Sequence, residues 1–331
     1  MDTRAVVLKS FEDRRRKYRR EFNLARANFS EDAVHDLRVA TRRLLALLAL
    51  IHILAPEPDL KPLRKALKSQ LDGLDQLRDS QVMLGEVKAR ASELSGLEPM
   101  RQELEIRVEK LLVRAQRSLG ALTFVSTSNL NSRLLGLREY LSSQPQLGDP
   151  LAAADSAYAE VMHRYKTVDP ADPASFHLLR VPFKKFRYTV EVVQPLVPSL
   201  EKAALTNLSN YQTLLGNVQD ARVFLEALQH FAGEDITLPI VADGFPRIED
   251  MPSAPGNEIM TPTDGIMTDT AVIEDRVAIE DTQTQPSIET AHHFYTKRLN
   301  DAVSEAFSSL ANVESFWRSS PEQPFPWEKP T

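Results

Sequence analysis

The chain has 331 residues, of which 42% are hydrophobic and 26% charged, a composition typical of soluble globular proteins. It contains no cysteine, which excludes disulfides, thiolate catalysis and zinc–cysteine sites. There are only 11 glycines, and the many Leu, Ala, Arg and Glu residues favour helix over sheet. We therefore expect an all-α fold, and the length suits two modules.

Four helices are expected in the first module, residues 1–120. Their predicted ranges are 3–28, about 31–55, about 60–94 and about 99–119. Ser30 is expected to cap the second helix, and the prolines that follow Ala55 should end it. The cations that run beside the apolar face of the first helix are Arg15, Arg19 and Arg26.

Residues 121–149 are expected to connect this module to a second one, residues 150–313. The predicted helices of the second module are 151–167, 174–195, 199–230 and a last one beginning near residue 288. Asp172 followed by Pro173 is a typical start for the second of these helices. Strand signals are poor throughout. The C-terminal segment 314–331 should be irregular.

Acidic residues are concentrated in one segment. Residues 232–290 hold 13 Asp and Glu against 2 Arg, a net charge of −11, so the remaining chain carries +5 although the whole carries −6. Residues 232–287 also lose helical periodicity, and we interpret them as a disordered insertion in the second module. The pI near 5.7 therefore does not argue against an anionic ligand.

Two sequence motifs occur twice in the same order. The first copy of one motif, AVHDLRVATRR, contains His35, Arg38, Arg42 and Arg43. Its second copy, SFHLLRVPFKKFRY, lies 142 positions later and contains His177, Arg180, Lys184 and Lys185. Similarly, LDQLRDSQVML (74–84) returns as LGNVQDARVFL (215–225), which aligns Asp79 with Asp220. This order indicates a duplicated module and predicts two four-helix units related by an approximate twofold axis.

Helix geometry places the cations of the repeated motif on one face. At about 100° per residue, His35, Arg38 and Arg42 share a side of the helix. Apolar residues such as Leu44 and Leu48 project from the other side. A single basic helix is usually no more than a solvated charged face. Recurrence of the histidine and the cations at one register in both halves instead indicates a functional surface.

A stripe of this kind suits an extended polyanion. Arginine meets phosphate oxygens with a planar fork of donors, and lysine meets them as a mobile point charge. Several basic helices lining one groove would contact many phosphates at once, without a nucleophile, an acid or a metal. The two histidines have two interpretations: a hydrogen bond to phosphate aided by a neighbouring anion that favours the protonated ring, or a hydrogen bond that fixes one helix to the next.

The repeated His-x-x-Arg-Val core with its following cations, and the downstream LRD and VQD segments, resemble the conserved histidine α-helical domain (CHAD) family. The resemblance implies two pseudo-symmetric four-helix bundles around a basic groove that binds inorganic polyphosphate, in some members at polyphosphate granules. The residues that it implies as ligand-facing are His35, Arg38, Arg42, Arg43, His177, Arg180, Lys184, Lys185 and Arg187. Arg15, Arg19 and Arg26 of the first predicted helix are further candidate polyphosphate-binding residues.

Two other functions fit the repeated basic stripe less well. Binding of a nucleic-acid backbone is the second candidate, but aromatic residues for base stacking are scarce. A metal-assisted phosphohydrolase would use Asp79 and Asp220, yet both lie in apolar helical contexts where a carboxylate more often pairs with Arg. We therefore expect no enzyme activity, no metal and no cofactor. No apolar run is long enough to span a bilayer and the N-terminus lacks a signal-peptide core, which predicts a cytoplasmic protein.

Overall fold

The computed structural model describes residues 2–56, 58–121, 124–233 and 285–328. Within these ranges all regular secondary structure is helical and no strand occurs, so the predicted all-α class is confirmed. Most of the acidic segment, predicted as a disordered insertion over 232–287, lies outside the described residues. In the described part of the chain, no helix combines the length and the apolar character needed to cross a membrane.

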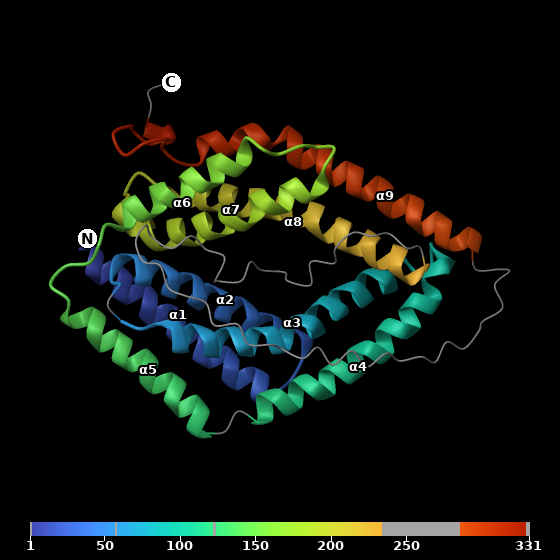
Figure 1. Cartoon of the computed structure of the whole chain (residues 1–331), viewed down its shortest axis with the longest axis horizontal. Helices are drawn as coiled ribbons and strands as arrows, with labels where there is room; N and C mark the ends of the chain where they lie inside the picture. Colours follow the sequence, from blue (N-terminus) through green and yellow to red (C-terminus); the bar gives the residue numbers. More distant parts are fainter. Residues whose placement is uncertain (1, 57, 122–123, 234–284, 329–331) are drawn as a thin grey trace, which may run out of the picture.

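Nine α-helices are present in the described ranges (Figure 1). They are α1 (Thr3–Ala27), α2 (Glu31–Leu54), α3 (Lys61–Arg90), α4 (Glu98–Ala121), α5 (Phe124–Ser143), α6 (Pro150–Tyr165), α7 (Pro173–Val193), α8 (Lys202–Phe231) and α9 (Gln285–Ser308). Short 3-10 turns add η1 (Ser95–Leu97), η2 (Gln194–Leu196), η4 (Leu310–Ser315) and η5 (Pro326–Glu328).

Capping residues begin the two helices that carry the repeated His-x-x-Arg motif, α2 and α7, which we call the motif helices. The Ser30 hydroxyl accepts a hydrogen bond from the backbone N–H of Ala33 at 3.2 Å. The Asp172 carboxylate accepts one from Ala174 at 3.0 Å, and Pro173 occupies the first turn. Both caps satisfy N–H groups that a helix start leaves without partners, as the sequence predicted. The α7 helix continues past Pro182, which is buried within it.

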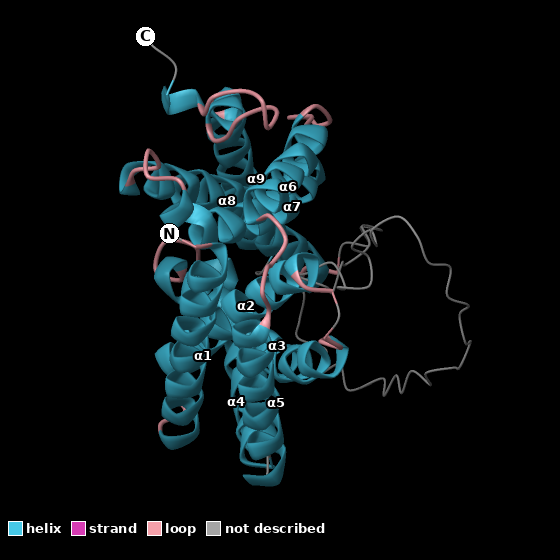
Figure 2. Ribbon diagram, turned by 90° about the vertical axis from the view of Figure 1, so that its left-hand side faces the viewer, coloured by secondary structure: helices cyan, strands magenta, loops and turns pink. Residues whose placement is uncertain are grey.

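Two hydrophobic cores hold the helices together. One is built mainly from α1, α2, α5 and most of α3; the other is built from α6, α7, α8 and α9. Figure 2 shows these two groups stacked one above the other. The α5 helix, which lies in the predicted connector, packs on α1 and α3 through Leu134, Leu137 and Leu141.

The turn between α3 and α4 crosses from one core to the other. Val87 at the end of α3, Leu97 in η1 and Met100 at the start of α4 all belong to the core of α6–α9. The η1 turn packs against α9. The α3–α4 turn therefore belongs to the first half of the sequence but packs in the core of the second half.

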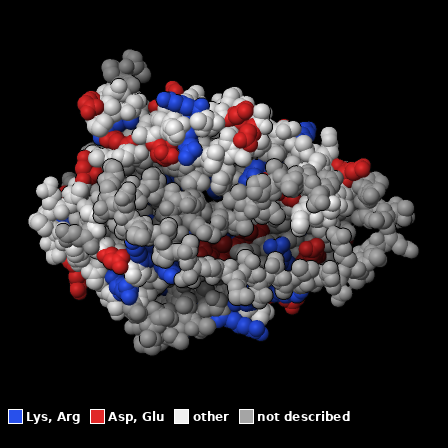
Figure 3. All heavy atoms as spheres, viewed as in Figure 1, with Lys and Arg blue, Asp and Glu red and all other residues white. Residues whose placement is uncertain are grey.

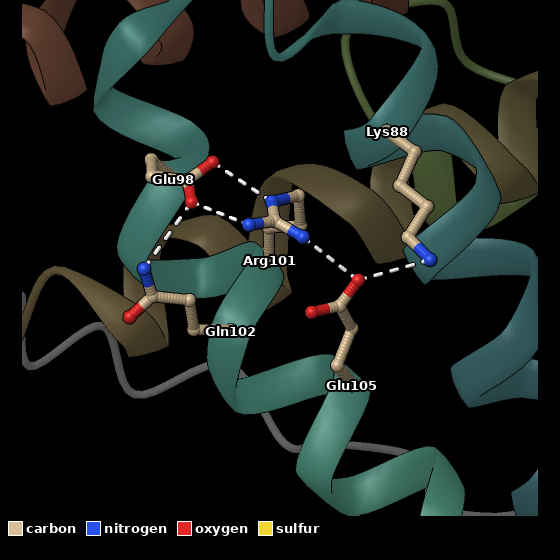
Figure 4. Close-up of polar contacts among 5 residues, drawn as sticks. All are labelled: Lys88, Glu98, Arg101, Gln102 and Glu105. Carbon is tan, nitrogen blue, oxygen red and sulfur yellow. Dashed lines mark hydrogen bonds and ion pairs between the residues drawn. The ribbon is translucent and has the colours of Figure 1, made fainter.

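An ion-pair network fastens α3 to α4 near this turn (Figure 4). Arg101 donates to Glu98 at 2.8 and 2.5 Å, and to Glu105 at 2.8 Å. Lys88 of α3 lies 3.0 Å from the same Glu105 oxygen, which joins the two helices. The network is close to the surface, where each ion pair contributes little to stability.

The C-terminal segment has little regular structure but closes the second core. Trp317 is fully buried among the rings of Phe186, Phe325 and Trp327. Its indole N–H donates to Asp155 of α6 at 2.7 Å. The C-terminal segment therefore contributes to the second core although its backbone is largely irregular.

Candidate anion-binding site

Arg38 and Arg42 on α2 share one carboxylate of the neighbouring α3. Arg38 Nε donates to Asp75 Oδ1 at 2.8 Å, and Arg42 Nη2 donates to the same oxygen at 3.1 Å. A second carboxylate, Asp79 Oδ1, lies 3.5 Å from Arg38 Nη2. Because α2 and α3 pack side by side, only 6% of Arg38 is exposed. This cation is therefore held between helices, with its guanidinium paired to carboxylates of α3.

Arg180 and Lys184 on α7 are the counterparts of Arg38 and Arg42 in the second repeat. Both are partly buried, because α7 packs against α8 on one side and α2 on another. Asp220 on α8 is the counterpart of Asp79. Burial raises the pKa of Asp220, and the neighbouring Arg180 partly opposes this increase.

The two motif helices bring their cations together. Burial lowers the pKa of Lys184 well below its usual value, and Arg42, Arg180 and Arg187 lower it further, with Asp75 opposing them. The pKa of Arg42 is likewise lowered by burial and then by Arg38. Cations from both repeats are thus close enough to repel one another where α2 meets α7.

The N-terminal helix adds a further cation at this junction. Arg14 Nη2 on α1 lies 3.6 Å from Glu191 on α7. The same carboxylate pairs with Arg187 at 3.0 Å, and Arg187 Nε donates to Gln212 of α8 at 2.8 Å. Arg187 is buried, and its guanidinium carbon lies 4.7 Å from the centre of the Tyr188 ring. We call the following residues the central charge cluster: Arg14, Arg38, Arg42, Arg180, Lys184, Arg187, Asp75, Asp79, Asp220 and Glu191.

Asp79 adds a second carboxylate beside Arg38. Its side chain is 70% exposed, yet surrounding protein still raises its pKa by desolvation, and Asp75 and Asp220 act in the same direction. Arg38 and Arg42 oppose the increase. Figure 3 shows acidic side chains on the floor of a hollow in the middle of the molecule, with Lys and Arg beside it. The site is therefore of mixed charge, with carboxylates among the cations.

The two repeated histidines flank the cluster, and their surroundings lower the pKa of each ring. Burial, and then Arg78, lower the pKa of His35. Burial also lowers the pKa of His177; Gln219 partly offsets the decrease, although the two side chains do not reach hydrogen-bond geometry. Burial and neighbouring cations therefore disfavour the protonated ring that one of the two interpretations requires. Among the described residues, the buried Nδ1 atom of His177 has no hydrogen-bond partner.

The remaining residues predicted for the site have their described contacts elsewhere. Burial lowers the pKa of Lys185, and Glu160 of α6 opposes it, so Lys185 faces α6. Arg15 pairs with Glu12 at 3.0 Å on the side of α1 that meets α5. Arg19 and Arg26 are exposed. Arg43 is exposed too, but lies close enough to Arg14 to lower the pKa of that guanidinium.

Three members of the cluster, Asp75, Arg14 and Glu191, were not found from the sequence. Asp75 lies four residues before Asp79, and therefore on the same face of α3. Arg14 lies between Phe11 and Tyr18, on the buried stripe of α1, where a cation needs a partner. Both signals, a carboxylate one turn before the repeated one and a cation on an apolar stripe, were available in the sequence.

The fold and this cluster define an all-α protein in which two motif helices meet at a group of buried and partly buried charges. The family model described as CHAD domain matches residues 9–229, a range that includes both motif helices. The chain belongs to the CHAD domain family.

Two solved structures share the fold. The CHAD domain from the plant Ricinus communis is 18% identical, with a TM-score of 0.62 over 96% of this chain and 91% of that one. PptA from Streptomyces chartreusis is 15% identical, with a TM-score of 0.60 over 94% of this chain and all of that one. A comparison with curated protein sequences gave no match.

Proposed function

We propose that this protein binds inorganic polyphosphate at the central charge cluster without catalysing a reaction on it. The observation that carries the proposal is that Arg42 and Lys184, from different repeats, come together where α2 packs on α7, close enough for Arg42 to disfavour the charged form of Lys184. A polyanion would relieve this repulsion, because its closely spaced negative charges interact favourably with every cation at once. Membership of the CHAD family supports the same ligand class.

Arginine side chains in the cluster suit phosphoryl oxygens. A guanidinium presents several N–H donors in a plane, so one Arg can contact an internal carboxylate and an incoming oxygen together. Arg42 is partly exposed while its Nη2 donates to Asp75. The cation can therefore keep its structural partner while binding ligand.

The direct test is calorimetric titration with polyphosphate of defined length at fixed ionic strength. The double variant R180Q/K184Q should weaken binding at least about tenfold, since each charged contact contributes roughly 1–2 kcal/mol at a partly exposed site. The matched control is K9Q/R16Q, which removes the same charge from two exposed positions of α1 that project away from Arg14. Equal affinities of the two double variants would exclude the cluster as the site.

Two further arms of the experiment address the ligand and the absence of catalysis. Single-stranded DNA and RNA at matched phosphate concentration should bind more weakly; equal affinity would identify a general binder of phosphate backbones. Incubation with polyphosphate should release no phosphate above a protein-free control. Release that grows with time and is lost in R180Q/K184Q would show an enzyme.

Granule association, which we also propose, predicts that a fluorescent fusion gathers on polyphosphate granules and that R180Q/K184Q does not.

A further inference from the structure

The two halves of the central charge cluster differ at one repeated position. Aligning 74–84 with 215–225 keeps the carboxylate of Asp79 as Asp220, but places Gly216 where the first repeat has Asp75. Asp75 and Gly216 lie on α3 and α8, one helical turn before the conserved carboxylate. The second repeat therefore lacks one carboxylate that the first repeat has.

In the first repeat, Asp75 occupies donors of both motif cations. It accepts hydrogen bonds from Arg38 Nε at 2.8 Å and from Arg42 Nη2 at 3.1 Å. An anion that approaches Arg38 and Arg42 must compete with this carboxylate for the same N–H groups and must tolerate its negative charge. The first half is thus largely neutralised from within.

In the second repeat, the corresponding place beside Arg180 has no carboxylate. A Cβ atom added at Gly216 would lie 4.0 Å from Arg180 Nε and, among the described atoms, would meet nothing else within 4 Å. Within the described residues, the buried Nε atom of Arg180 has no hydrogen-bond partner. Arg180 corresponds to Arg38, whose Nε is the atom that donates to Asp75. A donor that is satisfied internally in one half is therefore left for a ligand in the other.

The surroundings favour an anion on this side. Buried donors without a partner are costly, so a ligand oxygen that accepts from Arg180 Nε gains more than one that displaces an existing carboxylate. Lys184, one turn along α7, is crowded by Arg42, Arg180 and Arg187. A tetrahedral oxyanion near Gly216 would offset the repulsion among these cations. A carboxylate at position 216 would offset it without a ligand, and the second repeat lacks that carboxylate.

We propose that the lack of a carboxylate at Gly216 leaves open a primary subsite for one phosphoryl group, held by Arg180 and Lys184, while the Arg38–Arg42 side is a weaker, secondary subsite. This inference rests on the proposed polyphosphate binding and specifies which part of the cluster holds a short chain. Tripolyphosphate, being short, should occupy the primary subsite; a long chain should extend across both.

The first experiment compares R180Q with R42Q, using tripolyphosphate as the probe. R180Q should lower its affinity at least tenfold and R42Q less than threefold, whereas long polyphosphate should respond to both substitutions. Equal effects of R180Q and R42Q on tripolyphosphate would overturn the inference while leaving the proposed function intact. Failure of the parent protein to bind long polyphosphate would instead remove the proposed function.

The second experiment fills the space beside Arg180. G216D should pair with Arg180 and lower tripolyphosphate affinity at least tenfold, while G216A should bind like the parent. The matched charge control is N217D, at the exposed neighbouring position. If N217D weakens binding as much as G216D, the effect is one of net charge, and the local pairing that defines the subsite is wrong. Circular dichroism of each variant confirms that the helical content is unchanged.

Discussion

Arg38 illustrates how the surroundings of a residue change the role expected from its sequence. The helical wheel places Arg38 opposite the apolar face of α2, and that is where it lies. However, the opposite face is covered by α3, so the side chain is 6% exposed and bound to Asp75. A helical wheel gives the direction in which a side chain points, but not which helix packs against it there. Breaking such an enclosed pair leaves a charge without a partner, which makes Arg38 a poor choice for a binding test because its loss would also destabilise the fold.

The carboxylates of Asp79 and Asp220 should make binding depend on pH. The pKa values of Asp79 and Asp220 are raised, so these carboxylates become neutral at a higher pH than ordinary aspartates as the solution is acidified. Polyphosphate affinity should therefore increase as pH falls from 7 towards 5, because repulsion between the carboxylates and the ligand decreases. The variant D79N/D220N should bind more tightly than the parent at pH 7 and show a flatter dependence.

The histidines provide the necessary control for this experiment. His35 and His177 also gain charge on acidification, though below their usual range because their pKa values are lowered. H35Q/H177Q should keep most of the pH dependence if the aspartates cause it. Calorimetric titration at several pH values and constant ionic strength measures both variants, and a dependence lost in H35Q/H177Q would assign the effect to the rings.

At the scale of helices, local signals in the sequence defined most of the elements. Ser30 and Asp172 cap the helices they were predicted to cap, and α1 and α2 lie within a residue or two of their predicted ranges. The place of the α3–α4 turn in the other core was not foreseen, because an amphipathic pattern identifies an apolar face but not the helix that covers it. The same limit hid Asp75, whose partners are on α2.

The C-terminal segment provides a test of packing at this scale. Trp317 is fully buried and hydrogen-bonded to Asp155, whereas Trp327 is only partly buried. W317A should lower the free energy of unfolding by about 3–5 kcal/mol, through lost apolar contact and a residual cavity. W327A should cost clearly less. Denaturant unfolding of both variants measures the difference; equal losses would mean that the segment does not anchor the second core through Trp317.

For the whole molecule, the cluster lies where helices from both halves meet, so a ligand bound there should stabilise the complete fold. At a free polyphosphate concentration 100 times the Kd, the free energy of unfolding should rise by about 2.7 kcal/mol if the ligand binds only the folded state. R180Q/K184Q should show a much smaller rise at that concentration. Thermal unfolding with and without polyphosphate measures this, and an equal shift in the variant would indicate binding outside the cluster.

The exchange of core residues at the α3–α4 turn has a consequence for the origin of the chain. Val87, Leu97 and Met100 come from the first half of the sequence but bury their surface against residues of the second half, among them Tyr295. A single ancestral copy with this turn would have left that surface in water, unless two copies associated and covered it for each other. A duplicated chain supplies both copies at once, so this surface is covered within one molecule.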